Sequence, residues 1–467
     1  MSSYLTPLLQ FQRFFLPALF ILLGWAIWRT VWRKDSAVGL ALYLGLVIVV
    51  DSFLNTGIYL PGLGTGSIRY SELCAVFLLI NRPPAPSECS LLRTVKYLVG
   101  FYFALLFLSA LGSDPMLAGI FEFRRLMIPQ IIAFLVATRG LGSREDYRRF
   151  FLCLIALAII MGLFVFWDVF FDRWLLKSEM LFKPEYYMNR KQGRFGGVFL
   201  NPNFLGAFVV LVFPPAFVWT LNEHQRGWRL FAWTGLLALV FSLVQTQSRG
   251  PLLAFGLALL MLAFGPFPGL SRVRRLGFLT FFVLLFTFFM PGFFQHAAER
   301  FATLDNEESE VEASRQTNWI YTGRIIADHP LGGVGFGEQQ FQRALDDYGY
   351  ATSYGRLYDN PHNSYLQMTV YAGIPVLAVF LTANLALLRR SARFALGGAV
   401  SGNIPAVFGL SVGIAGFLVC VYPDMHLFTQ NIAPVYWMFF GLLLSLVTQT
   451  SDANPIYHRT APLRPEG

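Results

Sequence analysis

The sequence has few charged residues for its length. Of its 467 residues only 13% are Asp, Glu, Lys or Arg, whereas a soluble domain carries about 25%. Hydrophobic residues make up 55% of the chain, Phe occurs 48 times, and the mean hydropathy is +0.53. This composition excludes an ordinary soluble fold, because one aqueous core cannot bury so much apolar surface, and it predicts that the bilayer is the solvent.

Several common functional patterns are also lacking. The four cysteines have neither disulfide nor zinc-ligand spacing, and they are Cys74, Cys89, Cys153 and Cys420. The glycine-rich segment 332–337 is followed by no Lys-Ser/Thr pair, so we interpret it as a flexible turn and not as a phosphate loop. The acidic run 305–312 has no His or carboxylate spacing typical of a metal site and is interpreted as a solvated face. We therefore predict no metal and no cofactor.

Apolar segments of spanning or near-spanning length make up most of the chain. They fall at residues 11–32, 38–58, 68–80, 95–112, 119–138, 150–171, 202–221, 229–247, 251–270, 277–294, 362–388, 404–422 and 432–450. The first lacks a basic start and a cleavage site, so we expect a retained span and not a signal peptide. The third is short, which leaves 12 or 13 spans open. The predicted fold is an all-α polytopic membrane protein of about 12–13 transmembrane helices, with a long external loop that is partly helical.

The span pattern divides the chain into five parts. These are N-terminal membrane helices (1–171), membrane helices whose external starts carry Arg (172–294), an external loop (295–361), C-terminal membrane helices (362–450) and a disordered tail (451–467).

The distribution of basic residues predicts the orientation. Of 36 Lys and Arg residues, 20 lie on one set of alternating connections, while the short segments of the other side hold five. The C-terminus is therefore expected in the cytoplasm and the long loops outside. The net charge of +9 then reflects topology, and we predict no nucleic-acid partner. The five exceptions are Arg13, Arg69, Arg124, Arg125 and Arg249.

Three predicted helices start in the same way on the external side. Asn201-Pro202 supplies a preferred N-cap followed by proline at the first helical position, and Ser248-Arg249-Gly250 precedes another proline. In the third helix Asn360 is the candidate cap, Pro361 takes the first position and His362 lies in the first turn. All three helices are expected to run inward, so that their starts face one side.

Two of these starts carry an external arginine, Arg194 or Arg249. Exposed N–H groups and the positive end of the helix dipole favour an anion, and guanidinium groups suit phosphate oxygens. The pattern indicates a diphosphate site. The alternative is that the caps are ordinary helix starts and that the arginines reach towards lipid phosphates.

His362 ends the external loop of about 65 residues that begins at Gln295. A helix N-terminus disfavours an imidazolium, and a neutral imidazole can act as a general base. Asn363 could orient it or bind a sugar hydroxyl. A purely structural histidine is the alternative.

Four ordered motifs together resemble a known family. They are Arg194-Phe-Gly-Gly-Val-Phe-Leu-Asn-Pro-Asn203, Gln247-Ser-Arg-Gly250, Arg315…Trp319…His329-Pro-Leu-Gly-Gly-Val-Gly-Phe-Gly337, and Pro361-His-Asn-Ser-Tyr-Leu-Gln367…Ala372-Gly-Ile374. This set resembles the bacterial O-antigen ligase/polymerase family over about residues 190–390.

The resemblance implies a metal-independent membrane glycosyltransferase of GT-C type in the bacterial inner membrane, working at the periplasmic face. Its donor would be an undecaprenyl-diphosphate-linked glycan, and its acceptor a glycan or lipid-linked glycan. By the same resemblance Arg194 and Arg249 would hold the diphosphate, and His362 would activate the acceptor hydroxyl with inversion at the anomeric carbon. Asn363, Arg315 and Asn203 are supporting candidates. Other polysaccharide-assembly membrane proteins are candidate partners.

One departure bears on the acceptor. Ligases that load lipid A core often carry a second histidine just before the His-Asn pair, whereas this chain has Arg356-Leu-Tyr-Asp-Asn-Pro361. This favours a polymerase of surface-polysaccharide repeat units over a ligase. A lipid-linked glycan transporter or flippase is the alternative from another class, with Asp51 as a candidate coupling acid. A transporter, however, needs no long external loop, and its charged groups are expected near mid-membrane.

Overall fold

The computed structural model describes residues 36–51, 90–138, 141, 144–171, 193–265, 308–349, 360–396 and 404–452, with isolated residues at 22, 25, 29, 72, 273, 276, 277, 280, 281 and 284. In these ranges the chain forms helices, turns and bends and no strand, which confirms the all-α class. The predicted spans 11–32, 68–80 and 277–294, the run 350–359 and the tail after 452 lie wholly or mostly outside them.

The described helices match most of the predicted spans. In chain order they are α2 (Ser36–Gly45) with the π-helical turn η2 (Leu46–Asp51), α5 (Ser90–Leu111), α6 (Met116–Ala137), α7 (Arg144–Phe171), η4 (Gly197–Phe199), α9 (Pro202–Asn222), α10 (Arg226–Thr246), α11 (Arg249–Phe264), α14 (Glu308–Asp328), α15 (Glu338–Asp347), α17 (Ser364–Ala372), α18 (Ile374–Leu396), α19 (Ile404–Cys420), η5 (His426–Phe428) and α20 (Ala433–Asp452). Among them α5, α7, α9, α10 and α18 are long and apolar enough to cross a membrane, and α2, α11, α19 and α20 are shorter apolar helices. This arrangement fits a polytopic membrane protein.

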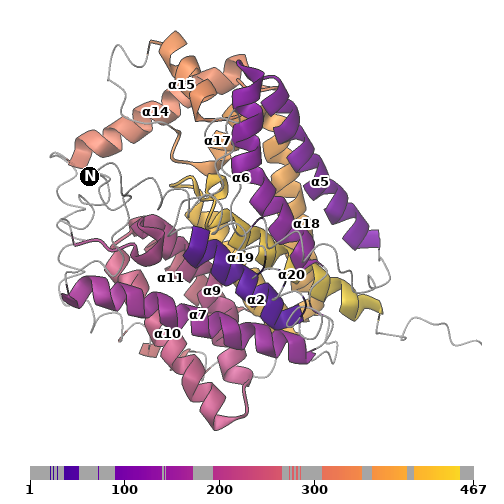
Figure 1. Cartoon of the computed structure of the whole chain (residues 1–467), viewed down its shortest axis with the longest axis vertical. Coiled ribbons are helices and arrows are strands. Elements are labelled where there is room, and N and C mark those ends of the chain that lie inside the picture. The colour runs from indigo at the N-terminus through magenta and orange to yellow at the C-terminus, as the bar shows by residue number, and fades with distance from the viewer. Residues whose placement is uncertain are drawn as a thin grey trace, which may run out of the picture.

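Helix α9 lies at the centre of the molecule (Figure 1) and is buried along most of its length. It packs against α19 through small residues, since a Cβ on Gly409 would lie 2.6 Å from the Cα of Pro215, and Gly413 faces Leu211. Glycines let two membrane helices approach closely. This close packing of α9 and α19 helps to position the site. Asn203 lies in the first turn of α9, and α19 leads into the loop that carries Asp424.

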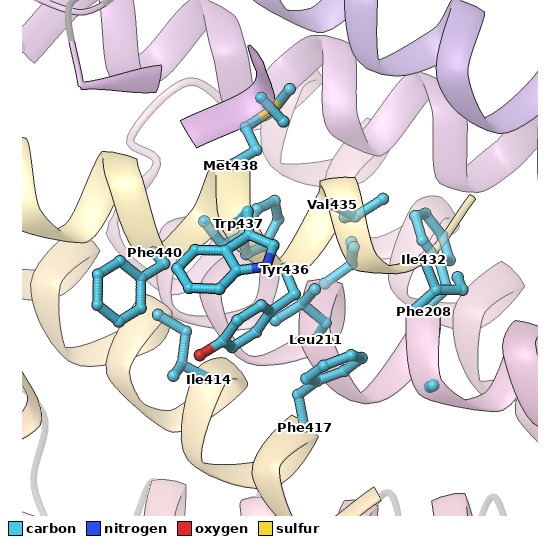
Figure 2. Close-up of a cluster of buried hydrophobic side chains, with 14 of the residues drawn as sticks. Phe208, Leu211, Ile414, Phe417, Ile432, Val435, Tyr436, Trp437, Met438 and Phe440 are labelled. Carbon is cyan, nitrogen blue, oxygen red and sulfur yellow. The ribbon is translucent and has the colours of Figure 1, made fainter. Parts of the chain in front are cut away.

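Aromatic packing holds α20 against this pair (Figure 2). The ring of Tyr436 stacks on Phe417 with centroids 5.0 Å apart and an interplanar angle of 18°, and Trp437 packs edge-to-face against Tyr436. The Tyr436 hydroxyl donates a hydrogen bond to Oδ1 of Asn384 on α18 at 2.7 Å. Helices α9, α18, α19 and α20 therefore form one closely packed body.

The predicted single span 362–388 is wrong, because Gly373 separates α17 from α18. Gly373 has a φ of 83°, which favours glycine. The rings of Tyr365 in α17 and Phe380 in α18 lie 6.4 Å apart, whereas in one straight helix these positions would be roughly 22 Å apart along the axis. Helix α17 thus folds back on α18, and only α18 continues as a spanning helix.

The glycine-rich segment 332–337 is a packed strap and not the flexible turn that the sequence suggested. The N–H groups of Val334 and Gly335 donate to the carbonyls of Val370 and Tyr371 at the end of α17, at 2.9 and 3.3 Å. A Cβ on Gly333 would overlap the Tyr371 backbone. Glycine is needed here because two backbones meet.

The two ends of the helical body differ. At one end Arg148 at the start of α7 forms an ion pair with Glu223, just after α9, at 3.0 Å. At the other end lie the starts of α9, α11 and α17, roughly 30 Å away along α9. Helices α14 and α15 lie together to one side of the upper ends of α5 and α6 (Figure 1), and Gln340 of α15 donates to the Asp114 carbonyl at 2.7 Å.

Candidate functional site

The segment before α17 places His362 in an unusual backbone conformation. Its φ is 47°, and Oδ1 of Asn360 accepts its N–H at 2.9 Å. Oδ1 of Asn363 accepts the N–H groups of Tyr365 and Leu366, so Asn363 is the N-cap. The predicted cap at Asn360 and the predicted place of His362 in the first helical turn are therefore wrong. His362 sits just before the helix, and a left-handed histidine of this kind persists only where its surroundings fix it.

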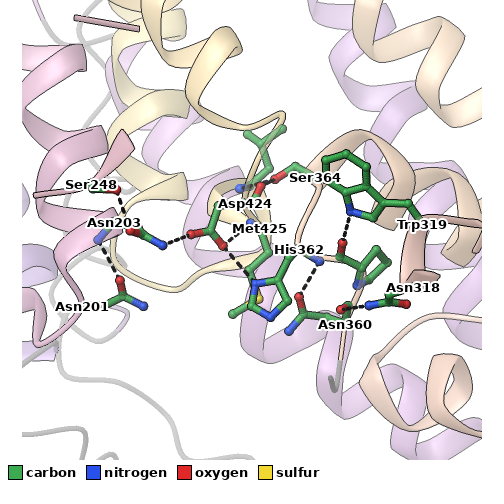
Figure 3. A network of polar contacts seen from close by, with 12 residues as sticks. Asn201, Asn203, Ser248, Asn318, Trp319, Asn360, His362, Ser364, Asp424 and Met425 are labelled. Atoms are coloured by element: carbon green, nitrogen blue, oxygen red, sulfur yellow. Dashed lines mark hydrogen bonds and ion pairs between the residues drawn. The ribbon is translucent and has the colours of Figure 1, made fainter. Parts of the chain in front are cut away.

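The loop after α19 brings an acid to His362. Oδ1 of Asp424 lies 3.6 Å from His362 Nδ1, with side-chain exposures of 6% and 23% (Figure 3). This distance suits an ion pair better than a tight hydrogen bond, and such contacts commonly shorten when substrate binds. Ser364 fastens the two segments together, because its N–H and its hydroxyl donate to the Asp424 carbonyl at 3.1 and 2.8 Å.

The other carboxylate oxygen of Asp424 faces α9. Oδ2 accepts from Nδ2 of Asn203 at 2.6 Å. Oδ1 of Asn203 in turn accepts from Nη2 of Arg194 at 3.0 Å and from the hydroxyl of Ser248 at 2.6 Å. A continuous polar network (Figure 3) thus joins the starts of all three predicted helices. The sequence predicted that these starts face one side, and the structure brings them together.

The structure gives fewer contacts for the other predicted residues. Asn201 is the N-cap of α9 as expected, and its side chain accepts the Asn203 N–H at 2.8 Å. Arg249 is the first residue of α11 and is partly buried. The next residue, Gly250, backs onto the Asp424 loop, since a Cβ there would lie 2.8 Å from Cγ of Pro423. Arg315 belongs to α14, but its side chain lies outside the described residues.

Helix α14 holds the His362 segment from outside. Nδ2 of Asn318 donates to the Asn360 carbonyl at 3.0 Å, and the indole N–H of Trp319 donates to the Pro361 carbonyl at 2.7 Å (Figure 3). The Trp319 ring also meets Tyr422 edge-to-face, with centroids 5.5 Å apart. Trp319 therefore touches both loops of the site, the one with His362 and the one with Asp424.

The electrostatics keep Asp424 ionised. Burial alone would raise the pKa of its carboxyl, but the contact with His362, the two nearby imidazoles and the Met425 N–H hold that pKa well below its usual range. The second imidazole, His426, is fully buried, and burial lowers its pKa despite the charge of Asp424. Burial therefore favours the neutral form of His426.

Two contributors to the site were missed in the sequence. Asp424 lies in a short connection between the last two spans, where a single acid resembles any solvated turn residue. Trp319 stood out only as part of a family motif, since a pattern cannot show that its N–H is used. A signal existed for Asp424 alone, as an acid between proline and methionine two residues before a second histidine. Among the described residues no cluster of three or more His, Cys, Asp or Glu side chains could hold a metal.

Part of this site lies within a segment that matches a known protein family. Residues 234–381 match the family model described as O-antigen ligase. The family resemblance is confirmed. The O-antigen ligase match runs from within α10 to within α18 and so contains Arg249, Trp319 and His362. The part of the site contributed by Arg194, Asn203 and Asp424 lies outside it. No match was found among curated proteins.

Proposed function

We propose that this O-antigen ligase-type protein is a membrane glycosyltransferase that takes a glycan from an undecaprenyl-diphosphate carrier and passes it to a hydroxyl acceptor. The family match supports the general activity. The observation that carries the finer proposal is the network from Arg194 through Asn203 and Asp424 to His362. It joins a cation suited to phosphate with a histidine suited to proton transfer.

The mechanism follows from these positions. Arg194 and Arg249 bind the diphosphate, where guanidinium groups and the start of α11 stabilise the charge of the leaving group. The hydroxyl of Ser248 makes no cap to α11 and donates to Asn203. The first N–H groups of α11 thus have no side-chain cap from Ser248, which favours an anion at this helix start.

His362 acts as the base. It removes the proton of the acceptor hydroxyl while the acceptor oxygen forms a bond to the anomeric carbon. The bond from that carbon to the phosphate oxygen breaks, and its electron pair leaves with the lipid diphosphate. Asp424 orients the imidazole and stabilises its protonated form, as a buried carboxylate does beside a catalytic histidine. In-line attack inverts the anomeric centre, and no metal is required.

Repeat-unit polymerisation is the favoured form of this activity, because the residues before His362 lack the second histidine common in lipid A core ligases. Donor and acceptor would then both be lipid-linked, in O-antigen, exopolysaccharide or capsule assembly. The active site would face the periplasm and the C-terminus the cytoplasm. A lipid-linked glycan flippase remains the second candidate, supported by the many apolar helices.

The deciding experiment assays the purified full-length protein with a fluorescent undecaprenyl-diphosphate oligosaccharide. We expect transfer by the wild type and loss of at least about a hundredfold in His362→Ala and Arg249→Ala. Matched controls are His224→Ala and Arg226→Ala, which change the same residue types on exposed positions at the opposite end of the body and should leave transfer unchanged.

The outcomes separate the candidates. Undiminished transfer in both site variants would overturn the site. Movement of the donor across proteoliposomes without transfer would support the flippase. Supplying either a second lipid-linked repeat unit or lipid A core as acceptor distinguishes polymerase from ligase.

A further inference from the structure

Asn203 stands between two groups of opposite charge. Its amide oxygen accepts from Arg194 at 3.0 Å, and its amide nitrogen donates to Asp424 at 2.6 Å. The orientation of the amide is fixed by its partners, since guanidinium and hydroxyl groups offer protons here and a carboxylate only accepts them. Ser248 adds a second donor to the same amide oxygen. The side chain therefore has one position that satisfies every neighbour.

The arrangement is unexpected from charge alone. A guanidinium and a carboxylate separated by one small side chain would normally meet directly in a bidentate pair, which is among the strongest polar contacts in proteins. Such a pair would occupy both the Arg194 guanidinium and the Asp424 carboxylate. The guanidinium would be less available to a diphosphate, and the carboxylate less available to His362. The amide of Asn203 keeps them apart while still giving each a hydrogen bond.

We propose that Asn203 is a positioning residue that prevents Arg194 and Asp424 from pairing, so that Arg194 serves the donor diphosphate and Asp424 serves His362. This inference rests on the proposed function and names a role for Asn203 within it. The residue carries no charge itself. Its amide lies between Arg194, which serves the leaving group, and Asp424, which serves the base His362.

The test measures binding of a lipid diphosphate to the full-length protein, with farnesyl diphosphate as the probe. Asn203→Ala should weaken binding at least tenfold, because Arg194 can then pair with Asp424. Asp424→Asn alone should leave binding within threefold of wild type. The double variant Asn203→Ala/Asp424→Asn should restore binding to within threefold, since the competing carboxylate is gone, while transfer stays low because His362 lacks its partner.

The rescue distinguishes this role from simple support of the Arg194 side chain. If Asn203 only held Arg194 in place, the double variant would bind as weakly as Asn203→Ala, and the inference would be wrong. It would also be wrong if Asn203→Ala bound normally. Asn222→Ala, which alters the same residue type at the far end of α9, is the control and should change neither binding nor transfer.

Separate measurements distinguish misfolding of a variant and failure of the proposed function from failure of this inference. Each variant is compared with wild type by thermal melting and size-exclusion chromatography. Asn203→Asp gives a second reading, because its carboxylate would pair with Arg194 and repel Asp424, and we expect weaker binding that Asp424→Asn does not fully restore. A wild type that binds no farnesyl diphosphate would overturn both the proposed function and this inference. Normal wild-type binding without the rescue overturns the inference alone.

Discussion

At the scale of single residues, the site depends on a buried carboxylate next to a histidine. Asp424 is 4% exposed and uses its two oxygens for different partners, His362 and Asn203. A carboxylate in such a place is stabilised by its contacts in the folded state more than in the unfolded chain. Its replacement should therefore affect catalysis and stability in ways that can be separated.

We predict that Asp424→Asn lowers kcat by about a hundredfold with little change in the donor KM. The amide keeps the shape of the carboxylate but cannot stabilise a protonated imidazole. Steady-state kinetics with a fixed acceptor check this prediction. A donor KM that rises in step with the loss of kcat would contradict it.

The pKa of Asp424 predicts a pH dependence of stability. Since that pKa is lowered in the folded protein, the stabilisation is present above the ordinary Asp value of about 4 and is lost as the pH falls below it. The melting temperature of wild type should exceed that of Asp424→Asn near neutral pH, and the difference should shrink below about pH 4. Melting curves from pH 7 to 3 test this, and a constant difference would refute it.

The sequence predicted candidate site residues that a local pattern marks. His362, Arg194 and Asn203 each stand beside a proline-marked helix start, which is visible in a short window. Asp424 was not predicted because its partners Asn203 and His362 are more than 200 and about 60 positions away, and no local pattern encodes such contacts. The cap at Asn363 was missed since two asparagines flank the Pro361-His362 pair and either can cap a helix.

At the scale of elements, α17 is held at both ends by the external segment. Trp319 and Asn318 bind carbonyls before its start, and the strap 332–337 binds carbonyls at its end. The sequence predicted that this segment is partly helical but not the break at Gly373. A long apolar run hides such a break, because membrane helices tolerate an internal glycine and hydropathy does not change across it.

Trp319→Phe tests the hydrogen bond that fixes the segment before His362. The change keeps an aromatic ring against Tyr422 and removes only the N–H that bonds to the Pro361 carbonyl. We expect about a fivefold loss of kcat, the equivalent of about 1 kcal/mol for one hydrogen bond. The neighbouring Ile320→Ala, whose side chain is 57% exposed, should be silent. Equal kinetics for the two variants would contradict the prediction.

Two glycines should respond to alanine in opposite directions. Gly373→Ala should destabilise the protein by at least about 1 kcal/mol, because its φ is 83° and a Cβ would overlap the Leu331 carbonyl. Gly323 lies inside α14, and a Cβ added there would have no atom within 4 Å, so Gly323→Ala should stabilise by about 0.5–1 kcal/mol. Melting temperatures decide both signs.

At the scale of the whole molecule, the ion pair at the start of α7 and the site lie at opposite ends of the helical body. The ion pair of Arg148 with Glu223 marks one end, and the network of Asp424 marks the other. Charge counting, which depends on composition near helix ends, yields an orientation that stays a prediction. It could not predict how α9, α19 and α20 pack, because that depends on the shapes of glycine and aromatic faces.

The proposed sidedness can be measured by cysteine labelling in intact cells. A cysteine at Asp347, exposed at the end of α15, should react with a membrane-impermeant maleimide from the periplasmic side. A cysteine at Arg393, exposed near the end of α18, should react only after permeabilisation. The reverse pattern would invert the proposed orientation.

The double anchoring of α17 has a consequence for exchanging parts between relatives. Residues 308–372 contain the histidine, the helix behind it and the groups that bind both ends of that helix. A chimera that exchanges this block whole would keep those internal contacts, leaving the Asp424 loop and the faces of α5, α6 and α18 to fit. A chimera that exchanges only residues 308–349 would pair a foreign α14 with the resident His362 segment. Acceptor preference should therefore transfer with the whole block more readily than with its external helices alone.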